Sequence, residues 1–250
     1  MAKCTFVWAH GLGSSMAHDD AVGVFDWSSL HDAARVVRYD ARGHGGTPAL
    51  QFDDWAFRWS SQVDDMLRAA GSGPFVAGGT GMGCATALYA ALRAPRRVQG
   101  LVLAAPPVAW EARAAEARRY EAAAALVETR GLGAWVESSS ASLLPPLLDE
   151  LPGARDVTIR HLLAMEEKAV SALLRGAAAS DLPGRDEIRS IVMPALILAW
   201  PDDPGHPLAT AQSLAELLVL SEIHVARDLS EVRAWPRRVG EFLSGLCQWE

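Results

Sequence analysis

The sequence predicts an α/β protein with a doubly wound, mostly parallel sheet and an inserted helical cap. Short apolar runs alternate with segments whose apolar residues recur at helical spacing, as in doubly wound folds. Residues 108–190 interrupt this alternation with consecutive helical patterns and no strand pattern. A chain of 250 residues suits one domain. We therefore expect a core of residues 1–107 and 191–250, with residues 108–190 as the cap.

Each predicted strand is an apolar run, because parallel strands are buried on both faces. The runs are residues 5–9, 35–39, 74–77, 98–104, 195–200 and 222–226. Helical spacing predicts core helices over residues 53–70, 82–93, 209–218 and 231–246. The cap is rich in Ala, Glu and Arg, and glycine and proline divide it into several helices, at Gly131, Pro145-Pro146, Pro152 and Pro183-Gly184.

Composition and charge exclude several function classes. The net charge of −7 opposes a nucleic-acid partner, since phosphate binding needs clustered Lys and Arg. The three cysteines, Cys4, Cys84 and Cys247, lack CxxC spacing, so we expect neither a disulfide framework nor a metal site, and a cytoplasmic location fits best. The chain enters a strand pattern at once, and no apolar run is long enough for a bilayer, so we expect no signal peptide and no membrane partner. The oligomeric state stays open.

Three motifs follow the first three predicted strands in order. His10-Gly11-Leu12-Gly13 follows the first, Asp40-Ala41-Arg42-Gly43-His44-Gly45 the second, and Gly79-Thr80-Gly81-Met82-Gly83 the third. Together they resemble the α/β-hydrolase superfamily, in particular its small esterase and enol-lactonase branch, over nearly the whole chain outside the cap. The third motif also looks like a dinucleotide fingerprint, but Cys84 stands where that fingerprint needs glycine, so we expect no nucleotide cofactor and no other cofactor.

The resemblance implies a Gly-x-Ser-x-Gly turn, and here its central residue is Gly81. Glycine has no side chain that could attack a substrate, so the usual acyl-enzyme chemistry is disabled. The neighbouring Thr80 and Cys84 are interpreted as packing residues that point away from the cleft. The family histidine, counted back from Pro236, falls on Leu229, so the usual general base is missing too.

By similarity Asp203 occupies the acid position, although an aspartate that caps the next helix explains it equally well. His206 lies in the same loop and is the best substitute base, with Glu111 as a possible neighbour; the alternative is an exposed loop histidine. The resemblance gives His10 and His44 a structural role. His224 is interpreted as a packed strand residue, and His18, His31 and His161 lie in no motif.

The loop at Gly11 and Leu12 and the turn at Met82 can still offer backbone N–H groups to a carbonyl or carboxylate. Trp110, Trp135 and Trp200 are candidates for the apolar walls of a small-molecule pocket, although each is equally explained as a core residue.

Three functions remain open. The protein is an ester or lactone hydrolase, or a lyase or isomerase, that works with Asp203 and His206 instead of a serine. Alternatively it is a non-catalytic protein that binds a small ligand or a partner on the same scaffold. In the third case Gly81 replaces the serine of a working hydrolase by design, with His206 as the native base.

Overall fold

A single six-stranded sheet forms the centre of the molecule. The computed structural model describes residues 3–31, 33–50, 52–53 and 55–246. The strands are β1 (Cys4–Ala9), β2 (Ala34–Tyr39), β3 (Phe75–Thr80), β4 (Val98–Ala104), β5 (Ala195–Ala199) and β6 (Ser221–Val225). They lie in the order β2-β1-β3-β4-β5-β6, and every pair is parallel. The predicted α/β class and parallel sheet are confirmed.

Strand residues alternate between two apolar layers, one on each face of the sheet. Val7 and Ala77 belong to one buried cluster, whereas Phe6, Trp8 and Val76 belong to the other. Since successive side chains of a strand point to opposite faces, both faces must be covered by helices. The first cluster is covered by α2 (Val63–Ala70), α3 (Met82–Arg93), α8 (Arg185–Arg189) and α9 (Leu208–Leu217). The second is covered by the 3-10 helix η1 (Trp27–Leu30), α10 (Leu229–Arg233) and α11 (Trp235–Leu246).

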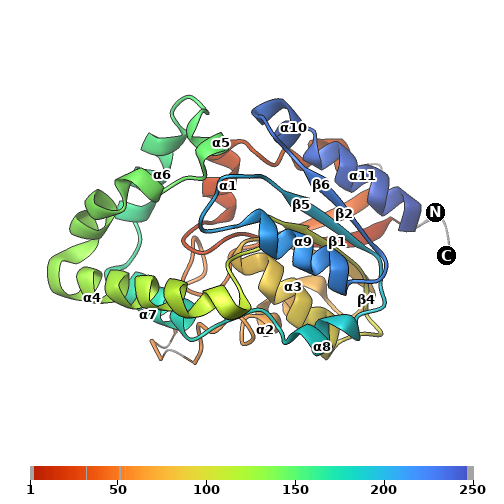
Figure 1. The fold of residues 1–250 in the computed structure, drawn as a ribbon, viewed down its shortest axis with the longest axis horizontal. Helices are drawn as coiled ribbons and strands as arrows, with labels where there is room; N and C mark the ends of the chain where they lie inside the picture. Colours follow the sequence, from red (N-terminus) through yellow and green to blue (C-terminus); the bar gives the residue numbers. More distant parts are fainter. Residues whose placement is uncertain (1–2, 32, 51, 54, 247–250) are drawn as a thin grey trace.

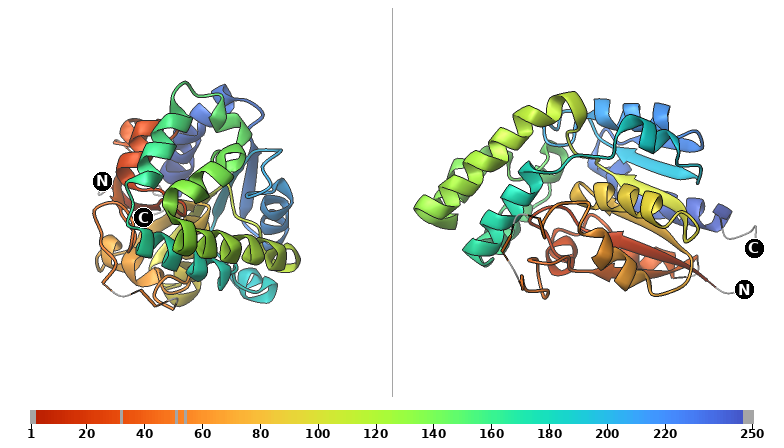
Figure 2. Two further views of the ribbon diagram at one scale, coloured as in Figure 1. Left: turned by 90° about the vertical axis from the view of Figure 1, so that its left-hand side faces the viewer. Right: turned by 90° about the horizontal axis from the view of Figure 1, so that it is seen from below.

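The carboxyl ends of the strands face the inserted helices, which lie on the left in Figure 1, away from both termini. The right-hand view of Figure 2 shows α4 and α7 projecting beyond the sheet at this end. The insertion contains η2 (Trp110–Ala112), α4 (Arg113–Ser138), η3 (Ser140–Ser142), α5 (Pro146–Asp149), α6 (Ala154–Leu163) and α7 (Glu167–Ala178). Helix α4 packs along α7 and bends at Gly131, whose φ is 81°. Helix α8, the last of the insertion, packs on α3 and α9 of the core instead.

Two of the predicted helices differ from the observed ones. Of the described residues between 53 and 70, only those of α2 are helical, because the preceding turns insert the fully buried Phe57 and Trp59 into the structure. Phe57 lies against Gly176 of α7, a contact that local periodicity could not reveal. The predicted helix 231–246 is divided at Ala234 into α10 and α11, and Pro236 is the second residue of α11, where proline is well tolerated.

The remaining core helix, α1 (Met16–Val22), follows the loop after β1 and packs against α6 of the insertion. Over the described part of the chain, no helix combines the length and apolar character that crossing a bilayer requires.

Candidate functional site

A tight turn between β3 and α3 lies at the centre of the candidate site. Its middle residue, Gly81, has φ 53° and ψ −112°, a conformation that favours glycine. The flanking glycines are required by space, because a Cβ on Gly79 would lie 2.6 Å from Gly83, and a Cβ on Gly83 would lie 2.3 Å from the carbonyl oxygen of Ala9. The glycine spacing of the motif therefore reflects the close passage of α3 over the sheet.

His206 faces this turn. Its Nε2 lies 3.1 Å from the position that a Cβ on residue 81 would occupy. The imidazole comes from the loop between β5 and α9, and its side chain is 31% exposed. The strand order explains the meeting, because the loops after β3, β4 and β5 emerge at the same edge of the sheet.

Asp203 holds the other side of the imidazole. Its Oδ2 lies 2.8 Å from Nδ1 of His206, and its Oδ1 accepts the backbone N–H of Gly205 at 2.9 Å. Burial raises the pKa of Asp203. The hydrogen bond and charge of His206 and the N–H of Trp200 lower it by a larger amount, so the pKa of Asp203 falls to about 2. The carboxylate is thus ionised at neutral pH and accepts a hydrogen bond from Nδ1 of His206, while Nε2 of the same ring faces Gly81.

Trp200 is buried beneath this pair. Its indole N–H donates to Oδ2 of Asp203 at 2.9 Å, and its ring stacks on Trp235 at a centroid distance of 5.1 Å. From the sequence, Trp200 was a candidate for the apolar wall of a pocket. In the structure its indole N–H bonds to the carboxylate of Asp203. The signal that could have indicated this contact was a tryptophan ending a strand three residues before the candidate acid.

Two histidines hold the loop after β1 against the loop after β2. Nε2 of His10 accepts the N–H of Ala41 at 3.0 Å, and Nε2 of His44 accepts the N–H of Gly13 at 3.1 Å. Burial lowers the pKa of both imidazoles, which keeps them neutral and able to accept these bonds. Their role is to hold backbone geometry, as their positions in the motifs indicated.

The same loop brings two predicted binding residues to the site. The Cα of Gly11 lies 3.9 Å from the Cβ position of residue 81. Leu12 packs against both small apolar clusters of the insertion, one around Leu174 and one around Leu173. Met82 is buried at the start of α3, and its sulfur accepts a hydrogen bond from Gln62 at 3.2 Å.

The other two tryptophans have different surroundings. Trp135 belongs to the cluster that contains Leu12, which places it on the insertion side of the loop. Trp110 donates its indole N–H to the carbonyl of Pro183 at 3.1 Å, and the guanidinium of Arg185 lies 4.2 Å above its ring. These contacts join Trp110 to the segment that leads into α8.

Three other residues considered from the sequence have partners other than the His206–Asp203 pair. Cys84 is fully buried, hydrogen-bonded to the carbonyls of Gly79 and Ala104, and burial raises the pKa of its thiol. Glu111 is exposed and pairs with Arg185 at 2.7 Å, and no bond between Glu111 and His206 is found among the described residues. Leu229 begins α10 and packs against the apolar cluster around Trp235.

A second polar cluster lies where α1 contacts α6. The rings of His18 and His161 stack at 4.5 Å, and Ser14 donates to Asp19 at 2.6 Å. Burial lowers the pKa of His18 to about 4 and raises the pKa of Asp19 to about 6. Sequence patterns did not reveal this cluster, since His161 comes from a distant segment of the chain.

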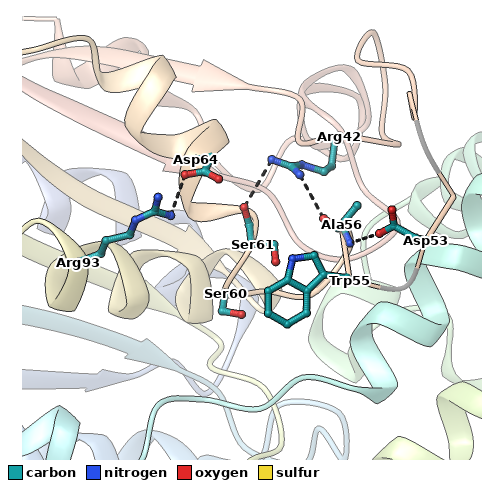
Figure 3. Close-up of a pocket in the computed structure, with 8 residues that line it drawn as sticks. All are labelled: Arg42, Asp53, Trp55, Ala56, Ser60, Ser61, Asp64 and Arg93. Atoms are coloured by element: carbon teal, nitrogen blue, oxygen red, sulfur yellow. Dashed lines mark hydrogen bonds and ion pairs between the residues drawn. The ribbon is translucent and has the colours of Figure 1, made fainter.

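Two cavities lie elsewhere, and none of the site residues lines either. The first, about 330 Å³, is bordered by Arg42, Trp55 and Arg93, with Arg93 paired to Asp64 at 2.7 Å (Figure 3). The second, about 760 Å³, lies between β6 and α11, and His224 is among its lining residues. His224 is thus placed away from the turn at Gly81.

A parallel sheet with helices on both faces, a glycine-flanked turn after its third strand and a His–Asp pair above that turn define an α/β enzyme-like scaffold. The alpha/beta hydrolase fold family model matches residues 5–150, and the chain belongs to this family. The resemblance predicted from the three motifs is confirmed.

Several solved structures have the same fold. A thermophilic esterase from Thermogutta terrifontis is 20% identical with a TM-score of 0.78, covering 99% of this chain and 90% of that one. An enol-lactonase from Burkholderia xenovorans LB400 is 20% identical with a TM-score of 0.75, covering 98% and 92%. A hydrolase from Pseudomonas aeruginosa PA01 is 21% identical with a TM-score of 0.77, covering 98% and 90%. No curated protein matches the chain.

Proposed function

We propose that this protein hydrolyses small esters or lactones by activating a water molecule, with His206 as the general base and no covalent intermediate at residue 81. One observation carries the proposal. Nε2 of His206 lies 3.1 Å from the Cβ position above Gly81, and Nδ1 of the same ring lies 2.8 Å from Asp203. In this proposal Asp203 and His206 act as the acid and base of a hydrolase, and His206 faces residue 81, where glycine has no side chain that could act as a nucleophile.

The proposed reaction begins with proton transfer from water to Nε2 of His206. The water oxygen bonds to the carbonyl carbon, and the electron pair of the C=O bond moves onto the carbonyl oxygen. Collapse of this intermediate breaks the bond to the leaving alkoxide, which takes the proton back from the imidazolium. Asp203 stabilises the imidazolium and keeps the ring oriented throughout.

Charge on the carbonyl oxygen needs nearby donors. We assign this role to the backbone N–H groups of Leu12, in the loop after β1, and of Met82, the first residue of α3. Donors placed where charge develops in the transition state lower the barrier, and backbone groups need no particular side chain. The positions of Gly11 and Met82 beside residue 81 support this assignment.

The substrate class follows from the surroundings of the pair. Leu12 packs against the buried apolar clusters around Leu173 and Leu174, so the loop beside residue 81 has apolar surroundings on the insertion side, which suit a small uncharged carbonyl compound. Likeness to an esterase and an enol-lactonase supports an ester or lactone. We propose that the protein acts without a cofactor, on a small molecule rather than a nucleic acid or membrane, in the cytoplasm.

Gly81 also favours a second candidate, a non-catalytic protein that binds a small carbonyl-containing ligand or a partner. In this case His206 and Asp203 are retained for binding rather than for proton transfer. The two functions differ in turnover, which one set of variants can measure.

The experiment measures hydrolysis of p-nitrophenyl acetate and dihydrocoumarin by the wild type, His206→Ala and Asp203→Asn. His224→Ala is the matched control, because it removes an imidazole that lines a different cavity. We expect loss of His206 to lower kcat/KM by about 10²–10⁴-fold, the usual contribution of a general base, with little change in the control. Rapid-quench mass spectrometry of the wild type should detect no acyl-enzyme.

An acyl adduct on the wild-type chain would overturn the water route. Equal activity of the wild type and His206→Ala would show that His206 is not the general base. Absence of turnover together with saturable binding of an unreactive ester analogue would support the binding function instead.

A further inference from the structure

The carboxylate of Asp203 is held by four hydrogen bonds. Oδ1 accepts the backbone N–H groups of Gly205 at 2.9 Å and His206 at 3.3 Å. Oδ2 lies 2.8 Å from Nδ1 of His206 and accepts the indole N–H of Trp200 at 2.9 Å. The indole bond comes from Trp200, the first residue after β5, whose ring is packed against Trp235 of α11.

We propose that Trp200 is a positioning residue of the hydrolytic site: its indole fixes Oδ2 of Asp203 and thereby aims His206 at the space above Gly81. This inference rests on the proposed function, because it concerns how the acid–base pair of that function is held. Sequence motifs of the α/β-hydrolase resemblance assign no such role to this tryptophan.

The backbone of this loop is supported from outside by the N–H of Val108, which donates to the carbonyl of Gly205 at 3.1 Å; the carboxylate of Asp203 needs a support of its own. Asp203 and His206 are three residues apart in one loop, and Asp202 between the strand and the acid has φ 61°, a left-handed conformation that non-glycine residues rarely adopt. Bonds within the loop move with it, so they cannot set its position relative to the sheet. A bond to Trp200, which follows the last residue of β5, can set that position.

Trp200 is itself rigidly held. It is 3% exposed, and its ring stacks on Trp235 of α11 with an interplanar angle of 11°. Trp235 is 1% exposed and also stacks on Phe25. A side chain packed in this way keeps one rotamer, which makes its N–H a fixed reference for the carboxylate.

The indole also affects the charge that His206 meets. Among the described residues, the ionisable side chain that bonds to Asp203 is that of His206, and the other donors are the neutral indole of Trp200 and the backbone N–H groups of Gly205 and His206. A donor on Oδ2 draws charge from the same oxygen that stabilises the imidazolium. Removing it should raise the pKa of Asp203, because the indole N–H is one of the groups that lower it, and should leave the imidazole less well oriented.

The test compares Trp200→Phe with Trp27→Phe. Both variants replace a buried tryptophan by phenylalanine in the same apolar cluster, but the indole N–H of Trp27 has no hydrogen-bond partner in the described structure, whereas that of Trp200 bonds to Asp203. We expect Trp200→Phe to lower kcat about tenfold with KM changed less than about twofold, since hydrogen bonds to charged groups are the strong ones. The acidic limb of the kcat–pH profile should move to higher pH by about half a unit. Trp27→Phe should do neither.

A second measurement covers the case in which Trp200→Phe does not fold. In ¹H–¹⁵N spectra of the wild type and Asp203→Asn, the indole N–H resonance of Trp200 should move upfield in the variant, while that of Trp27 stays in place. Unchanged kcat and pH profile in folded Trp200→Phe, or an indole resonance that ignores Asp203→Asn, overturns the inference. Retained activity in His206→Ala overturns the proposed function instead, so the two failures are distinct.

Discussion

The substitution Gly81→Ser tests the geometry of the site most directly. It adds a hydroxyl to the Cβ position that lies 3.1 Å from Nε2 of His206. A serine Oγ rotated toward the imidazole is then within the hydrogen-bond reach that activates a nucleophile. Asp203 already orients the ring, so the substitution completes a Ser, His206 and Asp203 triad.

The cost in stability can be estimated from the backbone. Residue 81 has φ 53°, where a non-glycine residue is strained by about 1–3 kcal/mol, and the contact with Nε2 requires the imidazole to move by a few tenths of an ångström. Gly81→Ala suffers the same strain without the hydroxyl, which makes it the matched control. Both variants should therefore unfold at similar, lower denaturant concentrations than the wild type.

The assay mixes each variant with p-nitrophenyl acetate and follows p-nitrophenol release and intact mass. Gly81→Ser should show a burst and a mass increase of one acetyl group, with acylation faster than wild-type turnover by about 10²-fold or more. The double variant with His206→Ala should lose the burst, and Gly81→Ala should never show it. If folded Gly81→Ser gives neither burst nor adduct, His206 is not aimed at residue 81, and our description of the site is wrong.

Two further predictions concern stability. Gly83→Ala should destabilise the protein by about 3 kcal/mol or more, because its Cβ would lie 2.3 Å from the carbonyl oxygen of Ala9. Gly133→Ala in α4, where a Cβ would meet nothing within 4 Å, should stabilise the protein by about 0.5–1 kcal/mol. Urea unfolding of both variants and the wild type measures these changes. Asp19→Asn should stabilise the protein at pH 7.5 by up to about 3 kcal/mol, because burial raises the pKa of Asp19 from 3.8 to about 6 and one pKa unit corresponds to about 1.4 kcal/mol. The folded state favours protonated Asp19, so the contribution of this group to wild-type stability is complete below pH 3.8 and is lost as pH rises through 6. If Asp19→Asn were more stable than the wild type by the same amount at pH 3.5 as at pH 7.5, this assignment would be contradicted.

The sheet was predictable because its signal is local. Runs of apolar residues marked all six strands, and the strand 98–104 was predicted with its observed bounds. The turn at Gly81 was also predictable from the sequence. Its flanking glycines are needed because a Cβ at either position would clash with the backbone where α3 crosses the sheet. Residues 53–62 were misread as helix because the burial of Phe57 depends on α7, far along the chain.

The site was only partly predictable. The lack of a nucleophile at Gly81 and of a histidine at Leu229 follows directly from the residue types in the sequence. The two interpretations of His206, as a base or as an exposed loop residue, have the same local pattern. Only the folded loop, with Asp203 bonded to Trp200, brings Nε2 to the turn after β3.

By itself, the sequence determined the fold family, the parallel sheet and the lack of a nucleophilic side chain at the central turn, since each depends on residue type and spacing along one stretch of chain. The tertiary structure decided which imidazole approaches that turn and what holds the acid beneath it. Those contacts join β3, β5 and α11, and a loop's position relative to distant strands depends on packing across the whole core, which no local pattern encodes.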